Sequence, residues 1–488
     1  MRRLVVCGIA LVSALAISTI VIASAAGGEV RRAVVPAAGA AHVAKTPIQH
    51  VVVIFQENHS FDNVLGGICV TDHLACDGTT TGVLHDGTTV PLAVAHDIVP
   101  VVAHYTAAQN LAINQGSMNG FDLMTACTAP VYKCYSQYDA SEIPNLRALA
   151  ESYVISDRTF SENPIPSWGG HMDLIAGQTD GFVGDNPNVN NKHARMPKPG
   201  WGCDSRLDAL WRDPADPSAP LRPEPACVPR GDGFGPYRPS PVAHIPTILD
   251  RLTGAGLSWH LYSDVAPHDS GYFWSICPTF ATCLYDKQNH NHPNPNWRKR
   301  STFTSDVAQG RLPTYSVILP SMELSQHNGE SMLAGDNYIG GLVSSIMNGP
   351  PAQWASTAIF ITYDDCGCFY DHVAPPAGSG LGIRVPMVIV SPQAKAAYVD
   401  STPASYDSML AFVEKNWALG PLTAGDRRAY DYCNSFVFTT LPCTGPGVAA
   451  HSARGRAAPR RVGLRRSAVP ASSRRYTGTH PPDPEDPT

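Results

Sequence analysis

Residues that could bind a metal ion directly follow two apolar runs in this sequence. Glu57 and Asn58 come just after the run at residues 50–55, and Asp364 and Asp365 come directly after a second run. Adjacent acidic and amide residues after a strand often only cap a turn or a helix. They are also the oxygen ligands that hard divalent cations prefer. The pattern indicates either two local caps or parts of one metal site.

Two further apolar runs, at residues 153–156 and 314–319, are followed by polar residues. A Pro-rich turn after the first ends at Ser167, and a loop after the second contains His327. In a parallel sheet the carboxyl ends of the strands meet at one edge, where ligands bind. Four such ends would gather carboxylates, an amide, a hydroxyl and an imidazole. A shared divalent cation site explains this set of side chains better than four unrelated caps do.

The runs themselves predict the fold class. Several are continuous and β-branched, which is typical of strands buried on both faces. Helical patterns lie between them, at residues 143–150, 245–253 and 336–347. Strands that alternate with helices predict an α/β protein, a three-layer α/β/α sandwich around a mostly parallel sheet.

A set of motifs resembles a bacterial phosphoesterase family that includes acid phosphatases and nonspecific phospholipases C. Gln56 to Asp62 resembles its E-N-x-S-F-D signature. Further similar motifs follow in the family's order, at residues 118–122, 166–171, 325–327, 335–339, 362–373, 382–386 and 391–392. The resemblance covers residues 48–392, most of the chain.

The resemblance implies an alkaline-phosphatase-like fold and a divalent metal ion of unknown identity. By position, the implied metal ligands are Glu57, Asn58, Ser167, Asp364 and Asp365. Ser167 would be the nucleophile, because coordination to a cation stabilises an alkoxide that is otherwise hard to form.

Three histidines are candidates for phosphate contacts. The resemblance places His104 and His327 there, and His268 could add another contact. Two positions depart from the family pattern. Gln326 replaces a glutamate that would orient His327, and Cys366-Gly367-Cys368 replaces a Gly-Gly pair after the two acids.

The predicted activity is hydrolysis of a phosphate monoester or a phospholipid, and the sequence does not separate these substrates. An acyl serine hydrolase is one alternative, but Ile-Pro-Ser-Trp-Gly around Ser167 lacks the first glycine of G-x-S-x-G. A phosphate-binding protein without turnover is the other alternative, and retention of every expected ligand argues against it.

The first 25 residues read as a signal peptide, with Arg2 and Arg3 before an apolar stretch and small residues at its end. An uncleaved membrane anchor is the alternative. We expect a flexible linker over residues 26–45, the catalytic domain over 46–445, and a secreted or cell-envelope protein.

Cysteine usage supports export. The twelve cysteines after Cys7 are even in number and mostly lie in close pairs. We expect neighbours to form disulfides. Zinc binding is the weaker reading, because no C-x-x-C pair occurs. The Cys366–Cys368 spacing is tight for a disulfide.

Residues 446–488 read as a disordered basic tail. Beyond Ala450 this tail has eight arginines against three acids, and its few apolar residues cannot form a core. It would serve for solubility, or touch an anionic membrane or cell-wall polymer. The remainder of the chain is acidic, which argues against nucleic acid as a partner.

Overall fold

The computed structural model describes residues 42–187, 200–285, 294–438 and 462–469. The expected signal peptide and most of the expected linker lie outside these residues. The description below concerns the unit that begins at His42.

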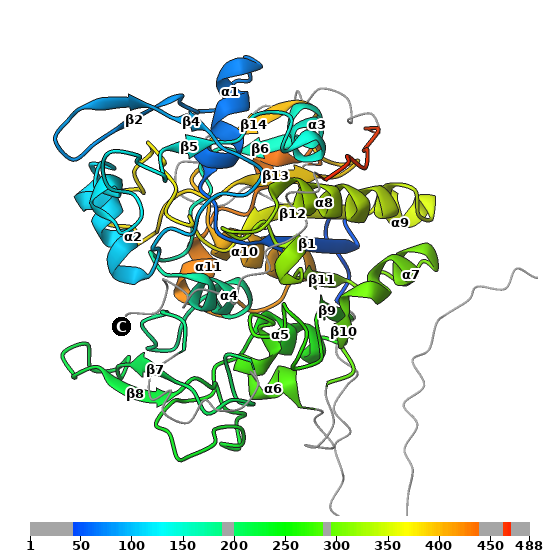
Figure 1. The fold of residues 1–488 in the computed structure, drawn as a ribbon. Coiled ribbons are helices and arrows are strands. Elements are labelled where there is room, and N and C mark those ends of the chain that lie inside the picture. Colours follow the sequence, from blue (N-terminus) through cyan, green and yellow to red (C-terminus); the bar gives the residue numbers. More distant parts are fainter. Residues whose placement is uncertain (1–41, 188–199, 286–293, 439–461, 470–488) are drawn as a thin grey trace, which may run out of the picture. The chain divides into compact units, whose positions relative to one another are not determined.

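An eight-stranded sheet forms the centre of this unit (Figure 1). Its strands, in spatial order, are β10 (Trp297–Lys299), β9 (Trp259–Ser263), β11 (Tyr315–Ile318), β1 (His50–Gln56), β12 (Thr357–Tyr363), β13 (Met387–Val390), β6 (Val154–Ser156) and β14 (Tyr398–Asp400). Neighbouring strands are parallel except for β13, which is antiparallel to both β12 and β6. The carboxyl ends of β1, β11, β12 and β6 therefore share one edge.

The central strands are buried on both faces. Every residue of β12 is buried, as are all residues of β1 after His50. Val53 of β1 pairs with Val317 of β11 on one side and Phe360 of β12 on the other. Continuous apolar runs form such strands because no side chain faces water.

Helices cover the sheet in two groups (Figure 1). One group is α3 (Pro144–Ser152), α7 (Phe303–Ala308), α8 (Met332–Met347) and α9 (Pro351–Ala355). The other is α4 (Ser167–Ala176), α5 (Ile248–Gly254), α10 (Tyr406–Trp417) and α11 (Ala424–Arg428). Crossovers between parallel strands are right-handed. The connections from β1 to β6 and from β11 to β12 therefore lie on one face of the sheet, and the connection from β6 to β9 lies on the other face. The predicted α/β/α fold class is confirmed.

Shorter elements surround this framework. They are α1 (Gly67–Thr71), α2 (Thr106–Ile113), α6 (Ala281–Leu284), β2 (Thr81–Val83), β3 (Thr89–Pro91), β4 (Ala93–Val94), β5 (Ser136–Gln137), β7 (Asp208–Trp211) and β8 (Arg222–Pro225). Among the described residues, no helix is both long enough and apolar enough to cross a membrane.

Four of the expected neighbouring pairs form disulfides: Cys69–Cys76, Cys127–Cys134, Cys203–Cys227 and Cys277–Cys283. Cys433 is also disulfide-bonded. Cys366 and Cys368 depart from the expectation, because both are buried and neither forms a disulfide in the structure. Their sulfur atoms lie 3.3 Å apart, within a tight turn.

Part of the tail also differs from the sequence prediction. Residues 462–469 were expected to be disordered, but they lie in the structure with Val462 and Leu464 packed against the core. Their backbone is hydrogen-bonded to Asn145 and Asn337. Composition alone does not predict this, because a segment without a core of its own can still bind to one.

Candidate active site

Two adjacent strands bring the first candidate residues together. Glu57 and Asn58 follow β1, and Asp364 follows its neighbour β12. Asn58 has a positive φ of 59°, a conformation that asparagine tolerates better than most residues. Its backbone N–H donates to Asp364 Oδ1 at 2.7 Å. This hydrogen bond joins the two strand ends into one site.

Helix α4 brings Ser167 to the same place. Ser167 is the first residue of this helix. Gly170 lets the helix approach closely, because a Cβ at that position would lie 2.6 Å from the Asp364 carbonyl oxygen. Residues four apart share one face of a helix, so His171 lies beside Ser167.

A chain of hydrogen bonds orients Ser167. Its hydroxyl donates to Asn58 Oδ1 at 3.1 Å. The Asn58 amide donates to His104 Nε2 at 2.9 Å, and His104 Nδ1–H donates to the Val102 carbonyl at 2.7 Å. The N-cap residue of α4 is Pro166, and Ser167 stands one position inside the helix. A helix-capping role therefore does not explain this serine.

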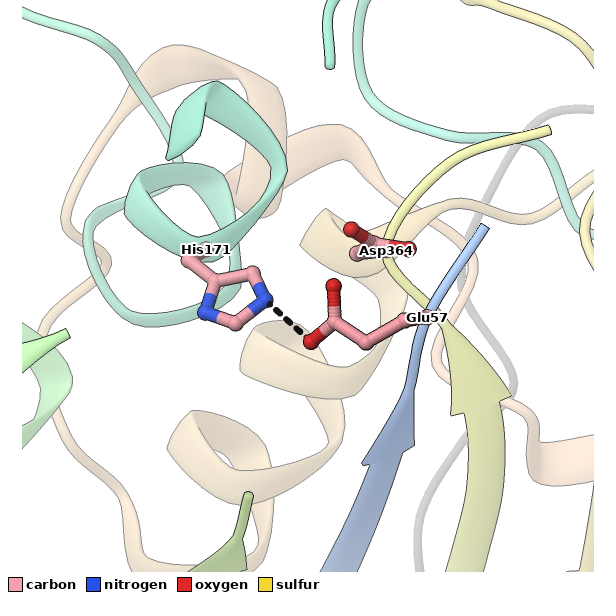
Figure 2. A group of neighbouring side chains, drawn as sticks. All are labelled: Glu57, His171 and Asp364. Carbon is pink, nitrogen blue, oxygen red and sulfur yellow. Dashed lines mark hydrogen bonds and ion pairs between the residues drawn. The ribbon is translucent and has the colours of Figure 1, made fainter. Parts of the chain in front are cut away.

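Glu57, His171 and Asp364 form a buried cluster. One ligand atom from each lies within 4.8 Å of the others. Figure 2 shows the His171 ring facing the Glu57 carboxylate, with 3.1 Å between Nε2 and Oε1. All three side chains are buried.

The His171 ring has a defined proton arrangement. Its Nδ1–H donates to the Trp274 carbonyl at 2.7 Å. Burial lowers the pKa of His171, with the nearby Asp364 charge opposing this. The neutral ring then directs the lone pair of Nε2 at a carboxylate oxygen. His171 Nε2 and Glu57 Oε1 are then both acceptors, and their separation of 3.1 Å requires a cation or a proton between them. A histidine whose second N–H is held by a backbone carbonyl is the usual arrangement at a metal ion.

The charged form of Asp364 is also disfavoured in this cluster. Burial raises its pKa well above the ordinary value, and the Glu57 charge raises it further. Its Oδ2 atom accepts no hydrogen bond from the described residues. Two neighbouring buried carboxylates with an imidazole and an amide fit a divalent cation. Glu57, Asn58, Asp364 and His171 would hold it, beside Ser167.

His171 was not among the metal ligands that the sequence predicted. The available signal was its four-residue spacing from Ser167, which places both on one helix face. Asp365 was predicted as a ligand and is buried next to Asp364, where its Oδ1 accepts from Gly367 N–H at 2.6 Å. Its role as a ligand stays a prediction.

His327 lies near His104, with 6.3 Å between the ring centroids. The Trp274 indole stacks on it at 6.0 Å, and its Nδ1–H donates to the Asn328 carbonyl at 2.8 Å. Gln326 does not orient this ring, since its side chain bonds to Tyr363 and Met332. The Asn328 backbone carbonyl, and not the Gln326 side chain, thus orients this ring.

His268 is not brought to this site by any contact among the described residues. Its side chain is 85% exposed, and it lies 3.7 Å from Asp269. Its predicted phosphate contact therefore stays a prediction without geometric support.

A second buried acidic group contains Asp62, Asp371 and His372. The Arg384 guanidinium lies within it, donating to Asp371 at 2.8 Å and to Asp62 at 3.2 Å. This arginine supplies the positive charge that a metal ion would otherwise supply. The group therefore serves as a structural ion-pair network beneath the site.

The mostly parallel sheet carries at its carboxyl edge Ser167 and a buried cluster that could hold a metal ion, an arrangement that a phosphoric ester hydrolase can use. The family model described as "Phosphoesterase family" matches residues 48–420. The chain belongs to this family.

Several characterised proteins are similar in sequence. Phospholipase C A of Mycobacterium tuberculosis is 23% identical over 81% of this chain and 78% of its own length. The non-hemolytic phospholipase C of Burkholderia pseudomallei is 29% identical over 34% of this chain. The chain spans about a third of that protein's length, 31%. A solved Vibrio parahaemolyticus protein of the alkaline phosphatase superfamily is 9% identical, with a TM-score of 0.34, over 76% of this chain and 67% of that one.

Proposed function

We propose that this protein is a secreted, metal-dependent hydrolase of phosphate esters that uses Ser167 as its nucleophile. The observation that carries the proposal is the buried Glu57–His171–Asp364 cluster one helical turn from Ser167. Family membership supports the reaction class. The substrate is a phosphate monoester or a phospholipid, and phospholipase C relatives favour the phospholipid.

The chain's own residues position the reaction. A bound divalent cation would stabilise the serine alkoxide and neutralise charge on the phosphoryl group. Ser167 Oγ forms a bond to phosphorus as the bond to the leaving oxygen breaks. Asn58 holds Oγ from one side, at 3.1 Å.

We assign to His327 the role of supplying the leaving oxygen with a proton. Stacking on Trp274 and the bond from Nδ1–H to the Asn328 carbonyl orient its ring, and the imidazolium form would donate from Nε2–H. Water then cleaves the phosphoserine and restores the hydroxyl. A carboxylic ester has no need of this cation-binding cluster, which argues against the acyl hydrolase alternative.

The test is turnover by purified protein of p-nitrophenyl phosphate and phosphatidylcholine, with and without a chelator. We expect Ser167→Ala to lower the rate by at least about a thousandfold with the fold intact. Ser161→Ala is the matched control, a buried serine whose hydroxyl donates to the Asn163 carbonyl at 3.0 Å. It should retain activity.

Near wild-type turnover by Ser167→Ala would disprove the serine mechanism. Turnover that a chelator leaves unchanged would disprove the metal requirement. Hydrolysis of a p-nitrophenyl carboxylic ester without any phosphate ester turnover would favour the acyl hydrolase instead.

A further inference from the structure

Helices α3 and α8 carry a stretch of the chain's own tail on their outer side. This arm segment, residues 462–469, is extended and is the red segment in Figure 1. We propose that Asn145 on α3 and Asn337 on α8 form a specific docking site for the arm segment of the same chain. The proposal does not depend on the proposed function.

Each asparagine pairs with both backbone groups of one arm residue. Asn145 accepts from the Arg465 N–H at 2.9 Å and donates to the Arg465 carbonyl at 2.9 Å. Asn337 accepts from the Ser467 N–H at 2.7 Å and donates to its carbonyl at 2.9 Å. The two arm residues are two positions apart, which is the repeat of an extended chain. The site therefore imitates the edge of a neighbouring strand, as in strand-addition recognition.

The body of the protein holds Asn145 through contacts other than those with the arm. Its Nδ2 also donates to Asp336 Oδ2 at 2.9 Å. Asp336 in turn accepts the backbone N–H groups of Asn145 and Leu146, at 2.9 and 2.8 Å. Gly340 leaves room for the amide, because a Cβ there would lie 2.6 Å from Asn145 Cγ. A side chain held this way loses little freedom on binding.

The arm's apolar residues add contact, while its charges do not. Val462 and Leu464 pack against the core, and Arg465 and Arg466 are exposed. The site thus recognises an extended backbone that carries the apolar side chains of Val462 and Leu464. Arg465 and Arg466 remain exposed and available for other contacts. Since the connecting residues 439–461 could extend about 75 Å at ~3.3 Å each, the arm of a second copy could also reach it. We assign the site to the same chain, because the structure seats the arm there within one chain.

Hydrogen–deuterium exchange on the full-length protein tests the docking site. We expect the amides of Arg465 and Ser467 to be protected in the wild type. Asn337→Ala should speed their exchange roughly tenfold, since it removes two hydrogen bonds. Asn348→Ala is the matched control, an exposed asparagine at the C-cap of the same helix whose amide bonds to Ser344.

Proline variants in the arm leave the body untouched. Ser467→Pro removes the N–H that Asn337 binds, and we expect its Arg465 amide to lose protection as it does in Asn337→Ala. Arg466→Pro, at the intervening exposed position, should leave protection nearly unchanged. Equal exchange in Ser467→Pro and Arg466→Pro, or no effect of Asn337→Ala, would overturn the proposal. Protection that appears only with concentration-dependent dimers in sedimentation would assign the site to a second copy and also overturn it.

Discussion

Because His171 lies in contact with Glu57, metal binding should be sensitive to substitution of His171 alone. We expect His171→Ala to lower metal affinity at least about a hundredfold, because it removes a nitrogen whose ring is already oriented by the Trp274 carbonyl. Metal content after dialysis, measured by mass spectrometry, checks this. His268→Ala is the control, since this exposed histidine should leave metal content unchanged. Equal metal content in His171→Ala and wild type would remove His171 from the site.

Single residues were predicted from sequence where a strand end fixes them. Glu57, Asn58 and Asp364 directly follow β1 and β12, so the sheet alone brings them together. Their roles as ligands stay predictions. His171 was not predicted as a ligand because its position depends on the rotation of α4 about its axis. The close approach of Gly170 to the Asp364 backbone sets that rotation. Sequence spacing does not reveal that packing.

The elements themselves were largely predictable, because long apolar runs between helical patterns permit few arrangements. The direction of β13 was not. It follows β12 without a crossover helix and pairs with it antiparallel, and apolar content is the same for either direction. Likewise, the edge strand β10 has three residues, which is too short a run to stand out in the sequence.

Helix α10 carries a pH-dependent feature at its first turn. The pKa of Asp407 is raised to about 9, first by burial and then by the charge of Glu162 and other acids. The folded state therefore holds a proton that the unfolded state releases above about pH 4. The free energy of unfolding should fall as pH rises from about 4 to 9.

Asp407→Asn tests this feature, because an amide imitates the protonated carboxyl at every pH. We expect thermal melts of the variant to show a smaller decline in Tm between pH 5 and 9 than the wild type. Some decline should remain, since burial and Asp426 also raise the pKa of Glu414 to about 9. Parallel declines in the two proteins would show that Asp407 is ionised in the folded state.

At the scale of the whole molecule, the number of titratable thiols depends on which cysteines are oxidised and on whether the first 25 residues are removed. Neither Cys366 nor Cys368 forms a disulfide in the structure. Thiol titration of the unfolded, unreduced protein should then find two thiols if the first 25 residues are removed. It should find a third, Cys7, if they are retained. No free thiol would show that Cys366 and Cys368 are oxidised in the mature protein.

The C-terminal tail gives the last prediction, since it combines the docked arm segment with eight arginines beyond Ala450. Truncation after Ala450 should leave turnover of a soluble phosphate ester within about twofold, because the Ser167 site receives no described contact from the arm. Loss of the Asn145 and Asn337 contacts should lower Tm. We further expect weaker binding to vesicles rich in anionic lipid, with the difference largest at low salt, where charges are least screened. Vesicles of neutral lipid are the control. Equal binding of both forms to anionic vesicles would leave the arm without a membrane role, while the Tm difference would still report its docking.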